Sequence, residues 1–465
     1  MKRAIAVVVL AAAGGIVMGI SMPRGPMTGS QAVLSVLLSI VVGGLAGLMS
    51  RSGWALVAAP LLFWTAVEII RIRARGPSVD APHASAFGLI ALLSGRGMHL
   101  LLSVVPMALA AAYGAAWARK SRPTGIAARL RQITAAALSI GTLTLTVATV
   151  VPPSTPSIAG GVAQLTTVDA NGYRIGVLLR GASPDLPVLL IVPGPPGGSE
   201  TGAVRKSLAA LEQRFVVATM DRRGGGASSA ALDAHPGPTV DTEVADVLAV
   251  TDELRRRFAE DKIVLVGHSG GSVVSVLAVQ RHPDRFRAYV GTGQAVDLPE
   301  TDRIAYADLL AWARSTGRDD VAGRVARQGP PPYHDVYDYE PIMLYQRQVY
   351  AQRDAGFVID VPEYSLLQKV HTLSTLLDTW DALYPRMQDI DLRRDVPRLG
   401  VPVYFVQGGE EMRSMTGLFA DWYRILQAPA KQLTTVPGAG HRVMFEEPAR
   451  FAEVMTRVLD ETAAS

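Results

Sequence analysis

A serine, a histidine and a glutamate follow one another along this chain in contexts that support nucleophilic catalysis. Ser269 lies in Gly267-His268-Ser269-Gly270-Gly271, directly after the apolar run Ile263–Val266 and before a second apolar stretch. A G-x-S-x-G segment between a buried strand and a helix makes a turn so tight that only small residues fit around the serine. This turn lifts the hydroxyl to where a base can reach it. We therefore predict that Ser269 is a nucleophile.

The base and the acid follow the serine in chain order. His441 ends a glycine-rich loop just past an apolar run, where its ring can swing over the serine. A histidine in this place takes the serine proton and later returns it to the leaving group, while a carboxylate fixes its tautomer and stabilises the imidazolium. Glu410 and Glu411 both follow the predicted strand at 402–406, and their positions alone leave the choice between them open.

The other histidines give no sign of a metal site. His268 abuts the serine, but a neighbour in such a turn points away from the nucleophile, so we expect it to pack under the sheet. The rest show no metal-ligand spacing, and the chain has no cysteine. We expect no metal and no cofactor, because acyl transfer through a serine needs neither. These histidines are His83, His99, His235, His282, His334 and His371.

Short apolar runs alternate with helical patterns beyond residue 163. Asn171-Gly172 between two such runs is a hairpin signal, and the stretch 241–258 has its apolar residues on one helical face. The alternation predicts an α/β fold, a mostly parallel sheet covered by helices on both faces, behind an antiparallel hairpin. Strands are expected at 164–168, 174–179, 188–192, 215–220, 263–266, 287–292, 402–406 and 432–436.

Four segments together resemble the α/β-hydrolases, and within them the proline iminopeptidase-like group. Val188–Gly198 is similar to that group's strand and His-Gly-Gly-Pro-Gly-Gly loop, and Asp221–Ser228 resembles its Asp-Gln-Arg-Gly-x-Gly-x-Ser segment. The resemblance, which covers about residues 163–460, implies that Ser269 is the nucleophile and His441 the catalytic histidine. The family's acid usually lies three residues after a strand-ending glycine, which points to Glu411.

The loop that should stabilise the oxyanion departs from the family pattern. The family uses two backbone N–H groups, of which the first maps onto Gly270. The second would fall on Pro195, which has no N–H. Losing one donor costs about 3–4 kcal/mol of transition-state stabilisation. Gly194 is therefore the predicted second donor, with Gly197 as an alternative; otherwise the enzyme is slow or the protein is no longer an enzyme.

The N-terminal third differs sharply from the rest in charge and hydropathy. Residues 1–152 hold thirteen Lys and Arg against two Asp and Glu, and the remainder holds 32 against 39. The basic excess thus belongs to an apolar region and does not indicate nucleic-acid binding. Runs of nearly the length that spans a bilayer predict five transmembrane helices, with four or six as alternatives. The run Ala84–Leu93 is too short to span and is expected to lie at the interface or to re-enter. The spans are expected at 4–20, 31–49, 54–70, 98–117 and 133–151.

The Lys/Arg bias predicts an orientation. With the N-terminus inside and five spans, eight basic residues lie in cytoplasmic segments and five in outer loops, which places the hydrolase part outside the cytoplasm. Glu68, beside Arg71 near the end of a span, is expected to reach the interface. The inner residues are Lys2, Arg3, Arg51, Arg119, Lys120, Arg122, Arg129 and Arg131, and the outer ones Arg24, Arg71, Arg73, Arg75 and Arg96.

The domain organisation follows from these patterns. Residues 1–151 form the transmembrane region, 152–163 a short Pro/Ser/Thr/Gly linker, 164–296 and 397–465 the two parts of the hydrolase core, and 297–396 a helical insertion. The resemblance implies that the insertion is a cap over the serine. The tyrosines of the insertion are expected to pack between its helices. Its acids Asp335, Asp338 and Glu340 are expected either to lie on a solvated face or to bind the free amine of a substrate.

We therefore expect a multi-pass membrane protein with an attached serine hydrolase. It would cleave a peptide, amide or ester bond through an acyl-enzyme on Ser269. The substrate would be a small molecule, a lipid ester, or a peptide that is cleaved as by an aminopeptidase. The alternative is a catalytically weak hydrolase-fold module that binds a ligand or partner, which the prolines of the oxyanion loop favour.

Overall fold

The computed structural model describes residues 1–119, 124–234, 237–353 and 358–462. Contacts divide the chain into two units, Met1–Pro152 with Ser365–Ser374, and Pro153–Tyr364 with Thr375–Ser465. Lys120, Arg122 and His235, which entered the charge and metal arguments above, lie outside the described residues.

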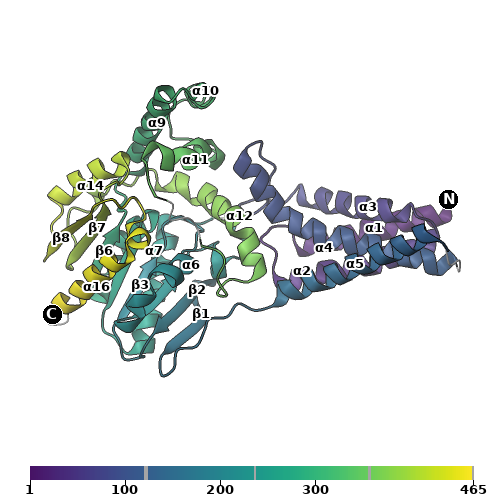
Figure 1. Ribbon diagram of the computed structural model, residues 1–465, viewed down its shortest axis with the longest axis horizontal. Helices are drawn as coiled ribbons and strands as arrows, with labels where there is room; N and C mark the ends of the chain where they lie inside the picture. The colour runs from purple at the N-terminus through teal and green to yellow at the C-terminus, as the bar shows by residue number, and fades with distance from the viewer. Residues whose placement is uncertain (120–123, 235–236, 354–357, 463–465) are drawn as a thin grey trace. The chain divides into compact units, whose positions relative to one another are not determined.

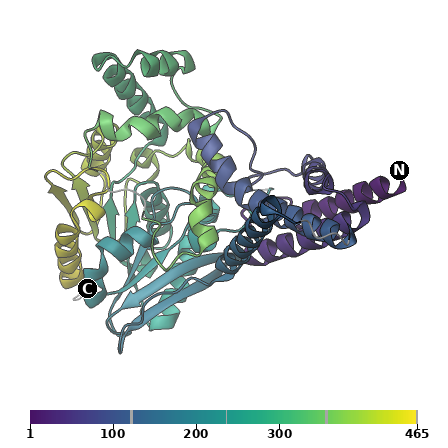
Figure 2. The ribbon, with the colours of Figure 1, turned by 45° about the vertical axis from the view of Figure 1, so that its right-hand side comes forward.

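Five helices that lie alongside one another make up the N-terminal part of the first unit (Figures 1 and 2). Glycines let their backbones approach closely: a Cβ on Gly43 or Gly47 would stand 2.1 Å from a carbonyl oxygen of the facing helix, which is the small-residue packing typical of membrane helices. The helices are α1 (Lys2–Ser21), α2 (Gly29–Ser50), α3 (Ala55–Arg71), α4 (Ala86–Arg119) and α5 (Ile126–Val150).

Among the described residues, four helices, α1, α2, α4 and α5, are long and apolar enough to cross a membrane. A helix also forms at the remaining predicted span, but α3 has only 17 residues, at the lower limit for a bilayer. One expectation needs correction. The run Ala84–Leu93 is not a separate short segment, because Ala86 onward is the start of α4. The side chain of Glu68, which is 43% exposed, pairs with Arg96 of α4 at 2.6 Å, and this neutralises the charge that interrupts the apolar pattern there.

The second unit is built on one eight-stranded sheet, in the order β1-β2-β4-β3-β5-β6-β7-β8 (Figure 1). β1 and β2 are antiparallel, β2 meets β4 antiparallel, and all later pairs are parallel. The mostly parallel α/β fold is therefore confirmed. The strands are β1 (Val162–Ala170), β2 (Tyr173–Gly181), β3 (Val188–Val192), β4 (Val216–Met220), β5 (Ile263–His268), β6 (Phe286–Thr292), β7 (Val403–Gly408) and β8 (Lys431–Val436).

The turn between β1 and β2 has the predicted chemistry. Asn171 and Gly172 both have positive φ, at 56° and 83°, as a tight hairpin of the right twist requires. The linker before β1 is not a free tether: Arg180 donates to the hydroxyl of Thr155 and the carbonyl of Pro156, both at 2.7 Å. Pairing of Arg180 with Glu212 at 2.9 Å fixes this arrangement.

Helices cover both faces of the sheet, because each fully apolar strand sends alternate side chains to opposite sides. Leu190 and Val192 join a core with α7, α8 and α14, whereas Leu189 and Ile191 join a second core with α6, α15 and α16. The helices are α6 (Thr201–Ser207), α7 (Val240–Phe258), α8 (Gly270–Arg281), α14 (Arg413–Ile425), α15 (Val443–Glu446) and α16 (Pro448–Thr462).

Between β6 and β7 the chain forms helices and no strand among its described residues. Aromatic side chains of this insertion pack on one another: Tyr339 meets Tyr333 and Tyr384 edge-on, at 4.8 and 5.3 Å between ring centroids. These aromatics thus contribute to packing within the insertion. The helices are α9 (Leu298–Ser315), α10 (Asp319–Gln328), α11 (Glu340–Val349), α12 (Leu366–Leu383) and α13 (Leu392–Asp395), with α9–α11 grouped together in Figure 2.

Candidate active site

The turn between β5 and α8 holds Ser269 in a strained conformation. Ser269 has φ 50° and ψ −126°, a region that residues with a side chain rarely adopt and that costs about 1–3 kcal/mol. The small neighbours are required, because a Cβ on Gly271 would lie 2.2 Å from the carbonyl oxygen of Pro193, and one on Gly267 2.7 Å from the Cα of Ser272. The elbow geometry predicted for G-x-S-x-G is present, and Ser269 is only half-buried.

The loops after β7 and β8 bring the acid and the histidine together. Gly408 lets them meet, since a Cβ there would stand 2.2 Å from the carbonyl oxygen of Gly440. The amide of Glu410 donates to the carbonyl of Ala439 at 2.8 Å, and the Glu410 side chain is exposed. The loop thereby turns Glu411 inward, where only 3% of its side chain is exposed.

Glu411, His441 and Ser269 form a hydrogen-bonded chain. Nδ1 of His441 lies 3.0 and 3.1 Å from the two carboxylate oxygens of Glu411, and Nε2 lies 2.9 Å from Oγ of Ser269. An ionised carboxylate only accepts, so Nδ1 carries the proton and Nε2 is left to accept the serine proton. A carboxylate, an imidazole and a hydroxyl in this geometry are able to carry out acyl transfer.

The surroundings of His441 favour its protonated form. Burial alone would lower the pKa of His441, but the charge of Glu411 and the hydrogen bond to it outweigh burial, with a smaller contribution from Glu200. The pKa of His441 is therefore raised from its ordinary value. On either side of the ring, the amides of Gly440 and Arg442 donate to Glu446 at 2.7 and 3.1 Å, which fixes the loop.

Glu200, which the sequence gave no reason to single out, connects the three segments around the serine. Its carboxylate accepts from Nδ1 of His268 at 2.8 Å, from the guanidinium of Arg442 at 3.1 Å and from the amide of Gly194 at 3.3 Å. Burial would raise the pKa of Glu200, but His268, Arg442 and the Gly194 amide outweigh it and hold the pKa at about 2. Glu200 is therefore a buried anion beside the triad.

His268 takes part in this cluster rather than packing passively. It is buried as expected, but it forms an acid–histidine pair with Glu200, and its ring centroid lies 5.5 Å from that of His441. Two carboxylate–imidazole pairs thus stand side by side. A lone His-Ser dipeptide in the sequence could not reveal this, because the partner lies 68 positions earlier.

The structure places the two predicted oxyanion donors differently. Gly270 is in the first turn of α8, directly after the nucleophile, where backbone N–H groups have no partner within the helix. Gly194 abuts the serine, since a Cβ on it would lie 2.9 Å from that of Ser269, but its N–H is taken by Glu200. Gly194 is therefore not free to donate in this arrangement.

Prolines shape the loop that contains Gly194. Gly198 donates its amide to the carbonyl of Pro195 at 2.9 Å, and Gly197 between them has φ 63°. This is a type II turn, with proline at its second position and glycine at its third. Gly197 packs against Thr379 of α12, where a Cβ would stand 2.3 Å from the hydroxyl. The turn and the contact with Thr379 therefore fix the loop that follows Gly194.

No group of three or more His, Cys, Asp or Glu side chains that could hold a metal ion occurs among the residues described above.

The second part of the chain is similar in sequence to known proteins. A family model described as serine aminopeptidase, S33, matches residues 188–448. A probable aminopeptidase, YbaC, from Bacillus subtilis (strain 168) is 26% identical over 290 residues, which cover 60% of this chain and 91% of the relative. An epoxide hydrolase from Caballeronia sordidicola is 31% identical over 166 residues, 36% of this chain and 46% of its own. The crystal structure of proline iminopeptidase from Mycobacterium smegmatis has a TM-score of 0.45 at 16% identity, over 65% of this chain and all of the other.

Proposed function

We propose the following reaction on the basis that the chain belongs to the serine aminopeptidase S33 family of α/β-hydrolases. In the proposed reaction Oγ of Ser269 attacks a carbonyl carbon while Nε2 of His441 takes the hydroxyl proton. The tetrahedral intermediate expels an amine or alcohol, which receives that proton from His441, and leaves an acyl-serine. A water molecule then attacks the acyl carbon while His441 takes its proton. His441 returns this proton to Oγ of Ser269 as the carboxylic acid leaves. The observation that supports this most is the unbroken Glu411–His441–Ser269 chain.

The proposed substrate is the N-terminal residue of a short peptide. This proposal rests on the Bacillus subtilis relative, whose name is probable aminopeptidase and most of whose length the match covers. Esters are a second substrate class, because an acyl-serine forms from an ester by the same steps. Gly270 supplies the oxyanion donor that follows the nucleophile.

We further propose that the first unit anchors the enzyme in a membrane. Four helices of suitable length and composition support this. The Lys/Arg bias favours an extracytoplasmic hydrolase unit, provided that the short α3 also crosses. The absence of cysteine from the sequence makes the test simple. A single Asn171→Cys variant should react with an impermeant maleimide on intact cells, whereas Ser52→Cys should react only after lysis; the opposite pattern would reverse the orientation.

A second function, a ligand-binding module without turnover, is favoured by one observation. Pro195 has no amide to donate, and the amide of Gly194 is bound to Glu200, so neither of these two residues supplies the second donor. Such a module would keep the fold and the half-buried serine but would not stabilise the oxyanion.

A fluorophosphonate probe separates the two functions. Purified full-length protein in detergent should be labelled, and Ser269→Ala and His441→Ala should not, although all three elute as folded protein. Labelling of the wild type that requires both residues supports the hydrolase, and a series of aminoacyl and acyl esters then defines the substrate. A folded wild-type protein that stays unlabelled would refute the hydrolase and favour the binding module.

A further inference from the structure

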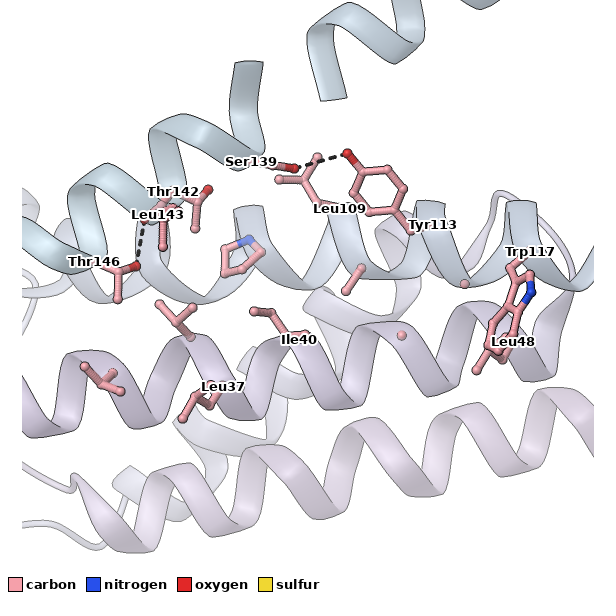
Figure 3. Close-up of a pocket in the computed structure, with 16 residues that line it drawn as sticks. Leu37, Ile40, Leu48, Leu109, Tyr113, Trp117, Ser139, Thr142, Leu143 and Thr146 are labelled. Atoms are coloured by element: carbon pink, nitrogen blue, oxygen red, sulfur yellow. Dashed lines mark hydrogen bonds between the residues drawn. The ribbon is translucent and has the colours of Figure 1, made fainter. Parts of the chain in front are cut away.

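An apolar pocket of about 710 Å³ lies among α2, α4 and α5, within the first unit (Figure 3). On α2 its lining extends from Val33 to Leu48, about 22 Å at the helical rise of 1.5 Å per residue. The opposite walls come from Pro106–Trp117 of α4 and Ser139–Thr146 of α5. The pocket is thus long and follows the helix axes.

The few polar side chains in the lining already have partners inside the protein. Ser139, Thr142 and Thr146 each donate to the carbonyl four residues earlier, at 2.7–2.8 Å, and the hydroxyl of Tyr113 meets that of Ser139 at 3.1 Å (Figure 3). None of the lining side chains carries a charge at neutral pH. A polar occupant would lose its hydration without gaining hydrogen bonds, so the lining matches a hydrocarbon chain.

The pocket exists because residue 44 is a glycine and because α5 packs only loosely against its neighbours. Gly43 and Gly47 are needed for close packing of α2 on α4, but a Cβ on Gly44 would meet nothing within 4 Å. The absent side chain of Gly44 therefore leaves space rather than making a contact. On α5, only Ala128 and Thr149 are buried, so this helix stands away from its neighbours.

One end of the pocket is basic. Trp117 and Leu48 lie together at that end (Figure 3), Trp117 is 77% exposed, and exposed tryptophans of membrane helices favour the headgroup level. Arg119 follows Trp117 by two residues and Arg51 follows Leu48 by three, while α2, α4 and α5 contain no Asp or Glu. This end therefore attracts a phosphate group.

We propose that the pocket binds one acyl chain of an anionic membrane phospholipid, whose phosphate lies at Arg51 and Arg119. The proposal rests on the proposed membrane insertion of the first unit but not on the hydrolase reaction. The apolar wall takes the chain, and the two guanidinium groups take the charge. The lining is uncharged and its hydroxyl groups already have hydrogen-bond partners, and one end of the pocket is basic. These properties favour this occupant over a charged peptide or a polar metabolite.

Photolabelling of full-length protein in nanodiscs tests the proposal. The discs contain phosphatidylcholine with a minor fraction of phosphatidylglycerol that carries a diazirine in its acyl chain, and labelled peptides are mapped by mass spectrometry. Labels should concentrate on the pocket-facing residues of α2, α4 and α5. Gly44→Leu should fill the pocket and reduce this labelling about tenfold, the equivalent of 1.4 kcal/mol.

A matched control distinguishes a site from lipid that merely surrounds the helices. Gly141→Leu makes the same change on α5, where a Cβ also meets open space and which does not line the pocket, so labelling should persist. Thr142→Leu fills the same pocket from α5 and serves if Gly44→Leu does not fold. Combined Arg51→Gln and Arg119→Gln should weaken labelling by the phosphatidylglycerol probe but not by a phosphatidylcholine probe with the same chain.

Three results would overturn the proposal. Labels spread evenly around all helices, or labelling equal in Gly44→Leu and Gly141→Leu, would show ordinary surrounding lipid. Crosslinks between two copies of the chain through the pocket would show that a second copy occupies it. Equal loss of both probes in the double arginine variant would remove the headgroup part. The experiment measures lipid labelling and not hydrolysis. All of these outcomes can therefore be told apart even if the protein has no hydrolase activity.

Discussion

Replacement of Glu200 by glutamine should shift the pH dependence of the hydrolase to lower pH. Glu200 is a buried anion that contributes to the raised pKa of His441. His268 connects the two groups, with a ring 5.5 Å from that of His441 and a 2.8 Å bond to Glu200. At a separation of roughly 9 Å and an effective dielectric constant of about 20, two unit charges interact by about 2 kcal/mol.

At 1.36 kcal/mol per pKa unit, this interaction is worth roughly 1–1.5 pKa units. Glutamine keeps the shape of the side chain but removes the charge, and with it the anion at Glu200 that pairs with Arg442, a residue whose own charge lowers the pKa of His441. Both changes disfavour the imidazolium. His441 must be neutral to accept the serine proton, so activity rises with pH through its pKa. The acid limb of the profile should therefore move down by roughly 1–1.5 units.

The assay is the pH profile of kcat/KM for an activated ester, or of the rate of fluorophosphonate labelling. Glu446→Gln is the control, since Glu446 binds the amides on both sides of His441 but does not contribute to the pKa shift of His441. Its acid limb should stay in place. An acid limb that is unmoved or shifted upward in a folded Glu200→Gln protein would refute the electrostatic argument.

Three further predictions concern the triad, the oxyanion loop and the fold. Glu411→Gln should lower kcat by about 10⁴, as expected when the histidine loses its orienting carboxylate, whereas Glu410→Gln should hydrolyse esters at the wild-type rate; similar losses in both would contradict the assignment. Pro195→Ala restores a backbone N–H and should raise kcat by up to about 10²-fold in the same ester assay; an unchanged kcat would mean that another donor already completes the site. Arg223→Gln should cost about 3–5 kcal/mol of unfolding free energy in denaturant titration, because it strands the buried Asp246 carboxylate that Arg223 pairs with at 2.7 Å; a loss below 1 kcal/mol would show that the pair is not important.

The strands and the elbow could be predicted because their signals are local. An apolar run such as Val188–Val192 is buried on both faces, which is the pattern of a parallel strand. Gly267 and Gly271 flank Ser269 at positions where a side chain would clash. The choice of Glu411 over Glu410 came from the resemblance to the α/β-hydrolases. Its meeting with His441 fits the topology, because the neighbouring parallel strands β7 and β8 end at one edge of the sheet.

Features that depend on distant partners could not be predicted. Glu200 gains its importance from Gly194, His268 and Arg442, which lie 6, 68 and 242 positions away, and nothing near Glu200 marks it. Capture of the Gly194 amide, which removes the donor predicted in place of Pro195, has the same origin. The unbroken α4 was missed because Arg96 interrupts the apolar pattern, and only the structure shows that Glu68 neutralises it.

The run of prolines beside the serine also makes one backbone proton unusually informative. From Pro193 to Pro196 only Gly194 carries an amide hydrogen, and that hydrogen is bound to Glu200. Exchange with deuterated solvent at this single site therefore reports how often the loop and Glu200 separate, without overlapping signals from adjacent residues. If this exchange is slow and becomes fast when Glu200 is protonated or a ligand binds, the Gly194 amide reports whether the loop is bound to Glu200 or released from it.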